Sequence, residues 1–204
     1  MAALNVNDVF KFVQFVANKE HRGWISPDEF NIAAEVAQLT LYSELEGQYA
    51  ATKKKHAYLR PFEESMTVED ADGIPAGFRI AISGYDDSNN EANEIELSEL
   101  PGILGSSIVA PEEGYPVFYL FDDEIKILPN TTELTIFYLR APNTTPTWGY
   151  TTPSGRPVYA VGSSTQFEFD ETAFLDISLR ILNHVGLNIG KEEITQYASA
   201  KLQG

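Results

Sequence analysis

The chain has 204 residues, of which 43% are hydrophobic and 12% aromatic, and it carries no cysteine and a formal net charge of −16. This length and apolar content suffice for one domain with a sizeable core and argue against an intrinsically disordered chain. The missing cysteines exclude disulfides, thiolate metal sites and cysteine nucleophiles, which fits a reducing compartment.

The negative charge is confined to one part of the sequence. Residues 1–60 hold 7 Lys/Arg against 7 Asp/Glu, whereas residues 61–204 hold 7 against 23. Such a surface repels phosphate and argues against a protein that wraps nucleic acid, although solubility alone also explains it. The start of the chain lacks a basic, apolar leader, and no stretch approaches a membrane span, so no membrane partner is predicted.

The first predicted helix begins after Asn5, whose side chain can cap it. Its apolar residues cover more than half of the helix circumference; they are Val6, Val9, Phe10, Phe12, Val13, Phe15 and Val16. One apolar stripe suffices to pack on a single core, so the excess predicts burial on two sides, by this chain or by a neighbouring one. Gly23 is the predicted left-handed terminator.

The second predicted helix is indicated by "WISPDEFNIAAEVAQ" and runs from Pro27 to about Glu46. Ser26 and Glu29 form an S-x-x-E capping box, and Pro27 stands where a missing N–H costs little. We expect the two helices to form an antiparallel pair.

The centre of the chain is predicted to be β-rich. A short strand, "FRIAIS", lies between acidic loops, and from residue 115 onwards β-branched and aromatic runs alternate with short polar turns, as in an antiparallel meander. A further hairpin is predicted around residues 153–155. Asp170 can cap another helix, and "KEEITQYASAKLQ" is predicted as a last short helix.

These elements predict an α+β fold, with terminal α-helices forming a helical bundle and a central antiparallel β-sheet or meander. We divide the chain into an N-terminal helical hairpin (1–50), a central β-rich region (51–168) and C-terminal helices (169–204), within one compact domain overall.

Residues suited to catalysis or metal binding are sparse. His21, His56 and His184 lie in three separate segments without metal-ligand spacing. Asp122, Asp123 and Glu124 could act as an acid/base pair, but three adjacent acids are more typical of a solvated hairpin turn. The sequence therefore predicts no enzyme activity, no cofactor and no metal site.

Three aromatic residues offer the one binding interpretation. Trp148 and Tyr150 are two residues apart and would share one face of a strand, with Tyr159 nearby, as in a platform that stacks sugar rings. Packing in the core or at a subunit interface explains the same residues.

Several segments together resemble a known family. They are "NVNDVFKFVQFVANKEHRGWISPDEFNIAAEVAQL", "ELPGILGSSIVAPEEGYPVFYLFDDEIKILP", and the terminal region from "FYLRAP" through "PTWGY" to "FDETAFLDISLRILNHVGLNIGKEEITQYA". This arrangement resembles the ring proteins of crAss-like and related short-tailed bacteriophages that infect Bacteroidetes, which stack beneath the portal as head–tail connectors. The resemblance covers about three-quarters of the chain and leaves out residues 50–95.

The resemblance implies a virion structural protein, not an enzyme, that forms a homo-oligomeric, dodecameric connector ring at the head–tail interface and contributes to the DNA passage channel. Its implied partners are further copies of itself, the portal protein and other neck or tail ring proteins, while double-stranded DNA passes without specific binding. The implied location is the virion, after assembly in the host cytoplasm. The candidate subunit-interface residues are Phe12, Phe15, Trp148 and Tyr150.

Two alternatives belong to other classes of function. In the first, the protein is a phage tail or surface module that binds glycans through the face formed by Trp148 and Tyr150. In the second, it is a hydrolase that uses the carboxylates of residues 122–124.

Overall fold

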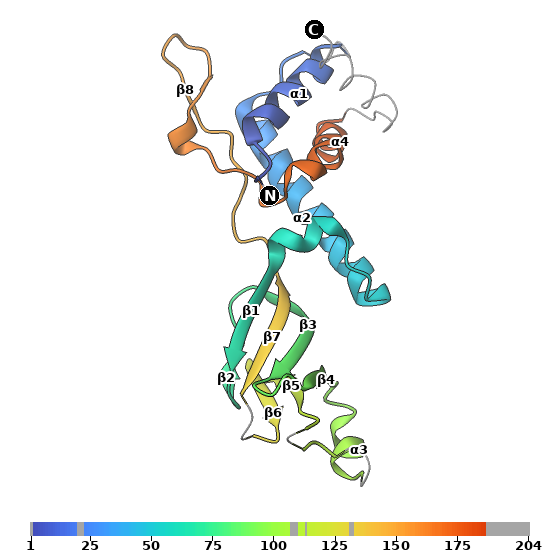
Figure 1. The fold of residues 1–204 in the computed structure, drawn as a ribbon. Helices are drawn as coiled ribbons and strands as arrows, with labels where there is room; N and C mark the ends of the chain where they lie inside the picture. The colour runs from blue at the N-terminus through green and yellow to red at the C-terminus, as the bar shows by residue number, and fades with distance from the viewer. Residues whose placement is uncertain (1, 20–22, 107–109, 113, 131–132, 187–204) are drawn as a thin grey trace. The chain divides into compact units, whose positions relative to one another are not determined.

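The computed structural model describes residues 2–19, 23–106, 110–112, 114–130 and 133–186. The fold is α+β, and its internal contacts divide the chain into two compact units (Figure 1). The helical unit combines residues 1–61 with residues 142–204, and the β unit comprises residues 62–141. Residues 51–61 and 142–168, which were predicted as part of the β-rich region, thus fall in the helical unit.

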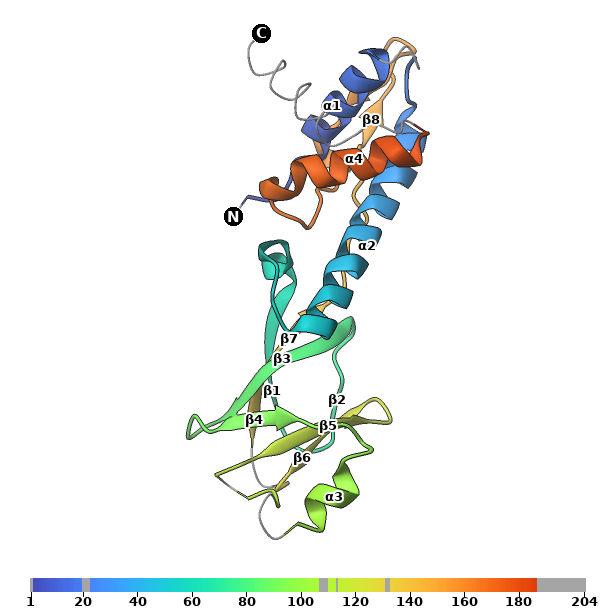
Figure 2. The same ribbon diagram turned by 90° about the vertical axis from the view of Figure 1, so that its right-hand side faces the viewer.

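The helical unit is built on three long helices, α1 (Val6–Lys19), α2 (Pro27–Thr52) and α4 (Phe174–His184). Helix α4 packs against both α2 and α1, as the two views in Figures 1 and 2 show. Alanines 33, 34 and 37 are buried on the core side of α2, where their small side chains let another helix approach closely.

The starts of α1 and α2 follow the predicted capping chemistry, whereas the end of α2 and the start of α4 differ from the prediction. Asn5 Oδ1 accepts the N–H of Asn7 at 2.8 Å, and Ser26 and Glu29 form the reciprocal capping box. Helix α2 extends beyond the predicted end to Thr52, where Lys53 adopts a left-handed conformation with φ 53°. Asp170 caps not α4 itself but a 3₁₀ turn, η3 (Glu171–Ala173), that leads into it. Gly23 is left-handed as predicted, with φ 83°.

The apolar excess of α1 is covered within the helical unit. Phe10 packs edge-on against Phe30 with ring centroids 5.0 Å apart, and Phe12 lies against Phe174 at 5.1 Å. Opposite sides of α1 therefore meet different elements of the same chain. The predicted last helix, "KEEITQYASAKLQ", lies outside the described residues.

A hairpin and two 3₁₀ turns complete the described helical unit. Strands β8 (Tyr150–Thr151) and β9 (Val158–Tyr159) pair as the predicted hairpin, followed by η2 (Val161–Ser163). The segment η1 (Ala57–Phe62) follows α2 and precedes the first strand of the β unit in the chain. In Figure 1 the hairpin lies to the left of α1 and α4 and projects away from them.

The β unit is a curved seven-stranded sheet in the order β1-β7-β3-β4-β5-β6-β2. The strands are β1 (Glu63–Val68), β2 (Asp72–Gly73), β3 (Phe78–Asp86), β4 (Glu91–Glu94), β5 (Val117–Phe121), β6 (Glu124–Leu128) and β7 (Leu134–Arg140), with the short helix α3 (Leu100–Leu104) after β4. Strands β5 and β6 form the predicted hairpin, with Phe118 opposite Ile127.

The sheet is not a simple meander, which corrects that part of the prediction. Strand β7 pairs with β1 and β3 rather than with β6, and the β4–β5 pair is parallel. Polar turns mark where strands end, but strand order depends on contacts between residues distant in sequence. The residues interpreted as acidic loops also contain the short strands β2 and β4.

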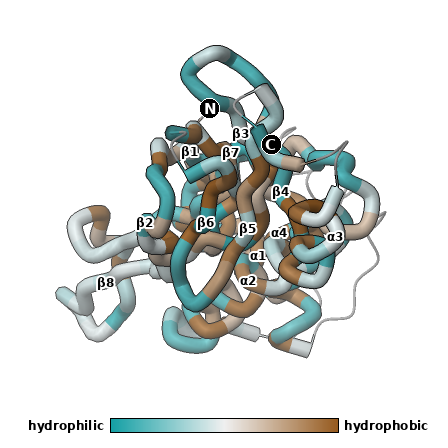
Figure 3. The backbone as a smooth tube through the Cα atoms, turned by 90° about the horizontal axis from the view of Figure 1, so that it is seen from below, coloured by the Kyte–Doolittle hydropathy of each residue, from teal (hydrophilic) through white to brown (hydrophobic). Residues whose placement is uncertain are grey.

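Alternating side chains build the core of the β unit. The buried cluster comprises Val68, Ala81, Ala92, Phe118, Ile125, Ile127, Leu134 and Ile136. A Cβ at Gly84 would lie 3.3 Å from both Ala92 and Phe118, so this glycine lets two strands approach closely. Figure 3 shows the resulting pattern, with brown apolar stretches along strands such as β5 and teal or pale loops.

Candidate functional site

Trp148, the centre of the candidate aromatic platform, is fixed by hydrogen bonds from two helices. Its indole Nε1–H donates to Asn7 Oδ1 at 3.1 Å, and its backbone N–H donates to Asn31 Oδ1 at 2.7 Å. The following residue must be glycine, because a Cβ at Gly149 would lie 2.3 Å from Ser163. The backbone around Trp148 is therefore held on both sides.

Other aromatic rings enclose the indole. Phe10 stacks on it with centroids 4.1 Å apart, and Tyr150 and Tyr159 lie at 5.9 and 5.7 Å. Trp148 is only 4% exposed, whereas Tyr150 is 37% exposed. A stacking platform requires an accessible ring face, and the described residues leave none on Trp148. The structure therefore assigns Trp148 to packing that joins the hairpin to α1 and α2.

The other two candidate interface residues differ in exposure. Phe12 is 1% exposed and packs on α4, while Phe15 is half-buried and its ring receives Lys19 Nζ at 5.7 Å from the centroid. Of the four candidates, Phe12 and Trp148 are thus buried within the helical unit, whereas Phe15 and Tyr150 reach its surface.

The carboxylates suggested as an acid/base pair form a tight turn between β5 and β6. Asp122 and Asp123 have φ of 52° and 62°, and both are exposed. Two consecutive positive φ values define the mirror-image turn that suits a two-residue hairpin. Glu124 pairs with Lys126 Nζ at 2.5 Å. These acids thus occupy turn and surface positions.

The histidines are not brought together in the part of the chain that the structure describes. His56 and His184 are exposed, and His56 lies edge-on to Tyr58 at 4.4 Å. His21 lies outside the described residues. No group of three His, Cys, Asp or Glu side chains that could hold a metal ion occurs among the described residues.

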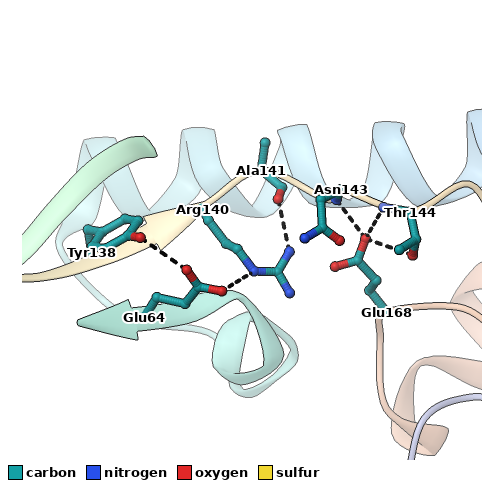
Figure 4. A network of polar contacts seen from close by, with 7 residues as sticks. All are labelled: Glu64, Tyr138, Arg140, Ala141, Asn143, Thr144 and Glu168. Atoms are coloured by element: carbon teal, nitrogen blue, oxygen red, sulfur yellow. Dashed lines mark hydrogen bonds and ion pairs between the residues drawn. The ribbon is translucent and has the colours of Figure 1, made fainter. Parts of the chain in front are cut away.

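Two glutamates organise the polar contacts drawn in Figure 4. In the β unit, Glu64 accepts the Tyr138 hydroxyl at 3.0 Å and Arg140 Nε at 2.7 Å. In the helical unit, Glu168 Oε1 accepts the backbone N–H groups of Asn143 and Thr144, both at 2.7 Å. Each carboxylate fixes backbone or side-chain geometry.

The shifted pKa values have the same structural origin. Burial and the hydrogen bond to Glu64 raise the pKa of Tyr138. Burial, together with the Asp176 carboxylate, raises the pKa of Tyr58 to about 12. Hydrogen bonds from Asn90 and its neighbours lower the pKa of Asp86, and the Ser26 hydroxyl lowers that of Glu29 in the capping box. Each shift belongs to a local structural contact.

Helix α2 has an exposed apolar row that was not predicted from the sequence. Helix α2 exposes Ile32 and Leu39, at 60% and 47%, and Trp24 just before it is 57% exposed. Ile32 and Leu39 are seven residues apart, so they share a face, and that face lies opposite Phe30 and Ala34 in the core. The seven-residue spacing of Ile32 and Leu39 is visible in the sequence. However, α2 also has many apolar residues on its core side, so the sequence alone did not indicate that these two are exposed.

The sequence matches no protein-family model, and no curated protein is significantly similar to it. No helix among the described residues is long and apolar enough to cross a membrane.

Proposed function

We propose that this protein is a bacteriophage virion structural protein that forms a homo-oligomeric, dodecameric connector ring at the portal or head–tail interface. The observation that carries the proposal is the division of charge between the two units. The β unit holds 17 Asp/Glu against 3 Lys/Arg, a net charge of −14, whereas the helical unit holds 13 against 11. In a channel lined by such an acidic surface, the carboxylates repel the phosphates of DNA, so the DNA passes without adhering.

The helices from both ends of the chain form the bundle that supports the ring in this proposal. Packing of α4 on both α1 and α2 supports it, because residues from the two ends then share one core. In the virion the ring stacks with the portal protein and with other neck or tail ring proteins. The enclosed indole of Trp148 argues against the glycan-binding alternative.

Native mass spectrometry and electron microscopy of the purified full-length chain test the proposal. We expect a closed dodecameric ring, and no mobility shift of double-stranded DNA in its presence. A chain that stays monomeric at every concentration would contradict the ring, and tight DNA binding at physiological salt would contradict a non-adhesive channel.

A further inference from the structure

The outer face of α2 is a surface of mixed apolar and acidic character that the described residues leave largely uncovered, although the Tyr150 hydroxyl of the same chain reaches Asp28 Oδ1 at 3.5 Å. Ile32 and Leu39 form its apolar row, and Asp28 and Glu35 each lie one turn before one of these residues. At the N-terminal end, Trp24 and Ile32 line a groove of about 580 Å³ together with Val185. Residues 27–52 contain no Lys, Arg or His, so the charges that α2 itself contributes to this face are all negative, and the imidazole of His184 borders the groove.

The β8–β9 hairpin has the opposite character. No Asp or Glu occurs between Glu133 and Glu168, and the single charge in residues 142–167 is Arg156, which is exposed at the hairpin tip. Val158 and Val161 are 50% and 73% exposed. Both Arg156 and Glu35 lack an ion pair within the part of the chain that the structure describes.

The register of the hairpin explains why its valine faces outward. Tyr150 pairs with Tyr159, and both rings lie against Trp148, so this face of the hairpin is covered. Val158 pairs with Thr151, and residues adjacent along a strand point to opposite faces. Val158 is therefore presented on the face that points away from the core.

We propose that the β8–β9 hairpin of one copy docks on the outer face of α2 in a second copy, with Val158 and Val161 on Ile32 and Leu39 and with Arg156 beside Glu35. The inference rests on the proposed ring, and it names the contact that joins neighbouring subunits. Charge complementarity selects a second copy as the occupant, since an acid-free, apolar hairpin meets a base-free, apolar helix face. Two different surfaces make a heterologous contact, which closes into a ring when the rotation per subunit permits.

Cross-linking of single-cysteine variants tests the contact, because the natural chain has no cysteine. Full-length Leu39→Cys and Val158→Cys chains are mixed and treated with a short bismaleimide. We expect a covalent dimer that contains one chain of each kind. The matched mixture of Lys11→Cys with Val158→Cys, in which the exposed Lys11 on α1 replaces Leu39, should give none.

Charge reversal provides the second, independent readout. Arg156→Glu and Glu35→Lys should each weaken self-association by at least about tenfold, and combining them should restore most of it, because the pair is then reversed rather than lost. Lys11→Glu, with the same change of charge as Arg156→Glu, should leave association unchanged. Circular dichroism checks that each variant is folded.

The outcomes separate this contact from the ring itself. Rings without cross-linked dimers, and without an effect of either charge reversal, would overturn the hairpin contact and leave the ring proposal standing. A wild-type chain that never associates would contradict both. If the Leu39→Cys variant reacts with a monofunctional maleimide but cross-links to no second copy, the thiol is accessible, no hairpin lies beside it, and the proposal is wrong.

Discussion

Individual buried polar residues replace missing backbone partners in the helical unit. Gln38 is 1% exposed; its Nε2 donates to the Thr144 carbonyl at 2.8 Å, and its Oε1 accepts the Glu168 N–H at 2.9 Å. Gln14 binds the N–H and the carbonyl of Ile25 in the same way. The backbone at Ile25, Thr144 and Glu168 lies outside helices and strands. In each case the amide side chain of one glutamine satisfies one backbone N–H and one backbone carbonyl.

Replacing Gln38 with a side chain of similar length but no hydrogen-bonding amide should therefore be costly. We expect Gln38→Met to lower the free energy of unfolding of the helical unit by about 2 kcal/mol, because two partly buried backbone groups lose their hydrogen-bond partner. Urea unfolding followed by tryptophan fluorescence measures this, since both tryptophans lie in the helical unit. Gln48→Met, at an exposed position of the same helix, is the control; an equal effect there would contradict the role of Gln38.

Tyr58 gives the helical unit a specific alkaline pH dependence. Its single hydroxyl hydrogen lies within reach of Asp176 Oδ2 at 3.0 Å and of the Thr172 carbonyl at 3.1 Å. Burial, followed by the hydrogen bond to the Asp176 carboxylate, raises the pKa of Tyr58 from its ordinary value of 10.0 to about 12. The folded state keeps this proton more tightly, so the stabilisation is complete below about pH 10 and is lost as the pH rises towards 12.

The variant Tyr58→Phe cannot donate these hydrogen bonds. We expect it to lower stability at neutral pH by about 1 kcal/mol, a modest value because the hydroxyl is partly solvated. We also expect the difference between wild type and variant to shrink from pH 10 upwards. Urea midpoints measured from about pH 8, below the window of proton release, up to about pH 12 check this. A constant difference would count against the Asp176 contact.

At the scale of elements, predictions based on local chemistry were accurate. The capping box at Ser26 starts α2, the predicted strand "FRIAIS" forms within β3, and the β-branched and aromatic runs after residue 115 form β5, β6 and β7. A capping box and a β-hairpin depend on residues a few positions apart, so the sequence suffices to recognise them, whereas the end of α2 at Thr52, which lies six residues beyond the predicted Glu46, was not recognised.

Features that depend on distant contacts were missed. Strand β1, "EESMTV", has only a weak apolar alternation, and it pairs with β7, the last strand of the unit in the chain. The enclosure of Trp148 requires Asn7, Phe10 and Asn31, from two helices more than a hundred residues earlier in the chain. The candidate platform was therefore predicted in composition, but its burial could not be predicted from spacing.

The N-terminal cap of α2 can be tested on its own. Ser26 Oγ accepts the Glu29 N–H at 3.2 Å, and the Glu29 carboxylate accepts the Ser26 N–H at 2.9 Å. We expect Ser26→Ala to lower the free energy of unfolding by about 1 kcal/mol, because the first N–H groups lose their acceptor. The same change at Ser43, exposed within α2, should cost nothing measurable. Thermal melts of the two variants under identical conditions decide, and equal midpoints would rule out the cap as a stabilising element.

At the scale of the whole molecule, the two units differ strongly in net charge. Closely spaced carboxylates repel one another in the compact β unit, which has a net charge of −14, whereas the helical unit is nearly neutral at −2. A protein selected for stability alone would not concentrate charge in this way. The cost is understandable if the acidic surface serves the passage of DNA, as proposed.

Salt should therefore stabilise the two units unequally. Screening by sodium chloride reduces repulsion between exposed carboxylates, so we expect the β unit to gain more stability than the helical unit between low and physiological ionic strength. Hydrogen exchange of peptides covering β3 and β7 reports the β unit, while fluorescence of Trp24 and Trp148 reports the helical unit.

A charge-reversal variant provides the control that links this effect to the acidic surface. Glu69, Asp87 and Glu91 are exposed in the β unit, and changing all three to lysine keeps the core intact while removing much of the net negative charge. The salt response of the β unit should fall strongly in this variant, and that of the helical unit should stay the same. Equal salt responses of the two units in the wild type would show that screening of carboxylates is not the cause. If the salt dependence of the stability of the β unit were unchanged in the triple variant, the same conclusion would follow. The acidic surface would then not lower the stability of the β unit.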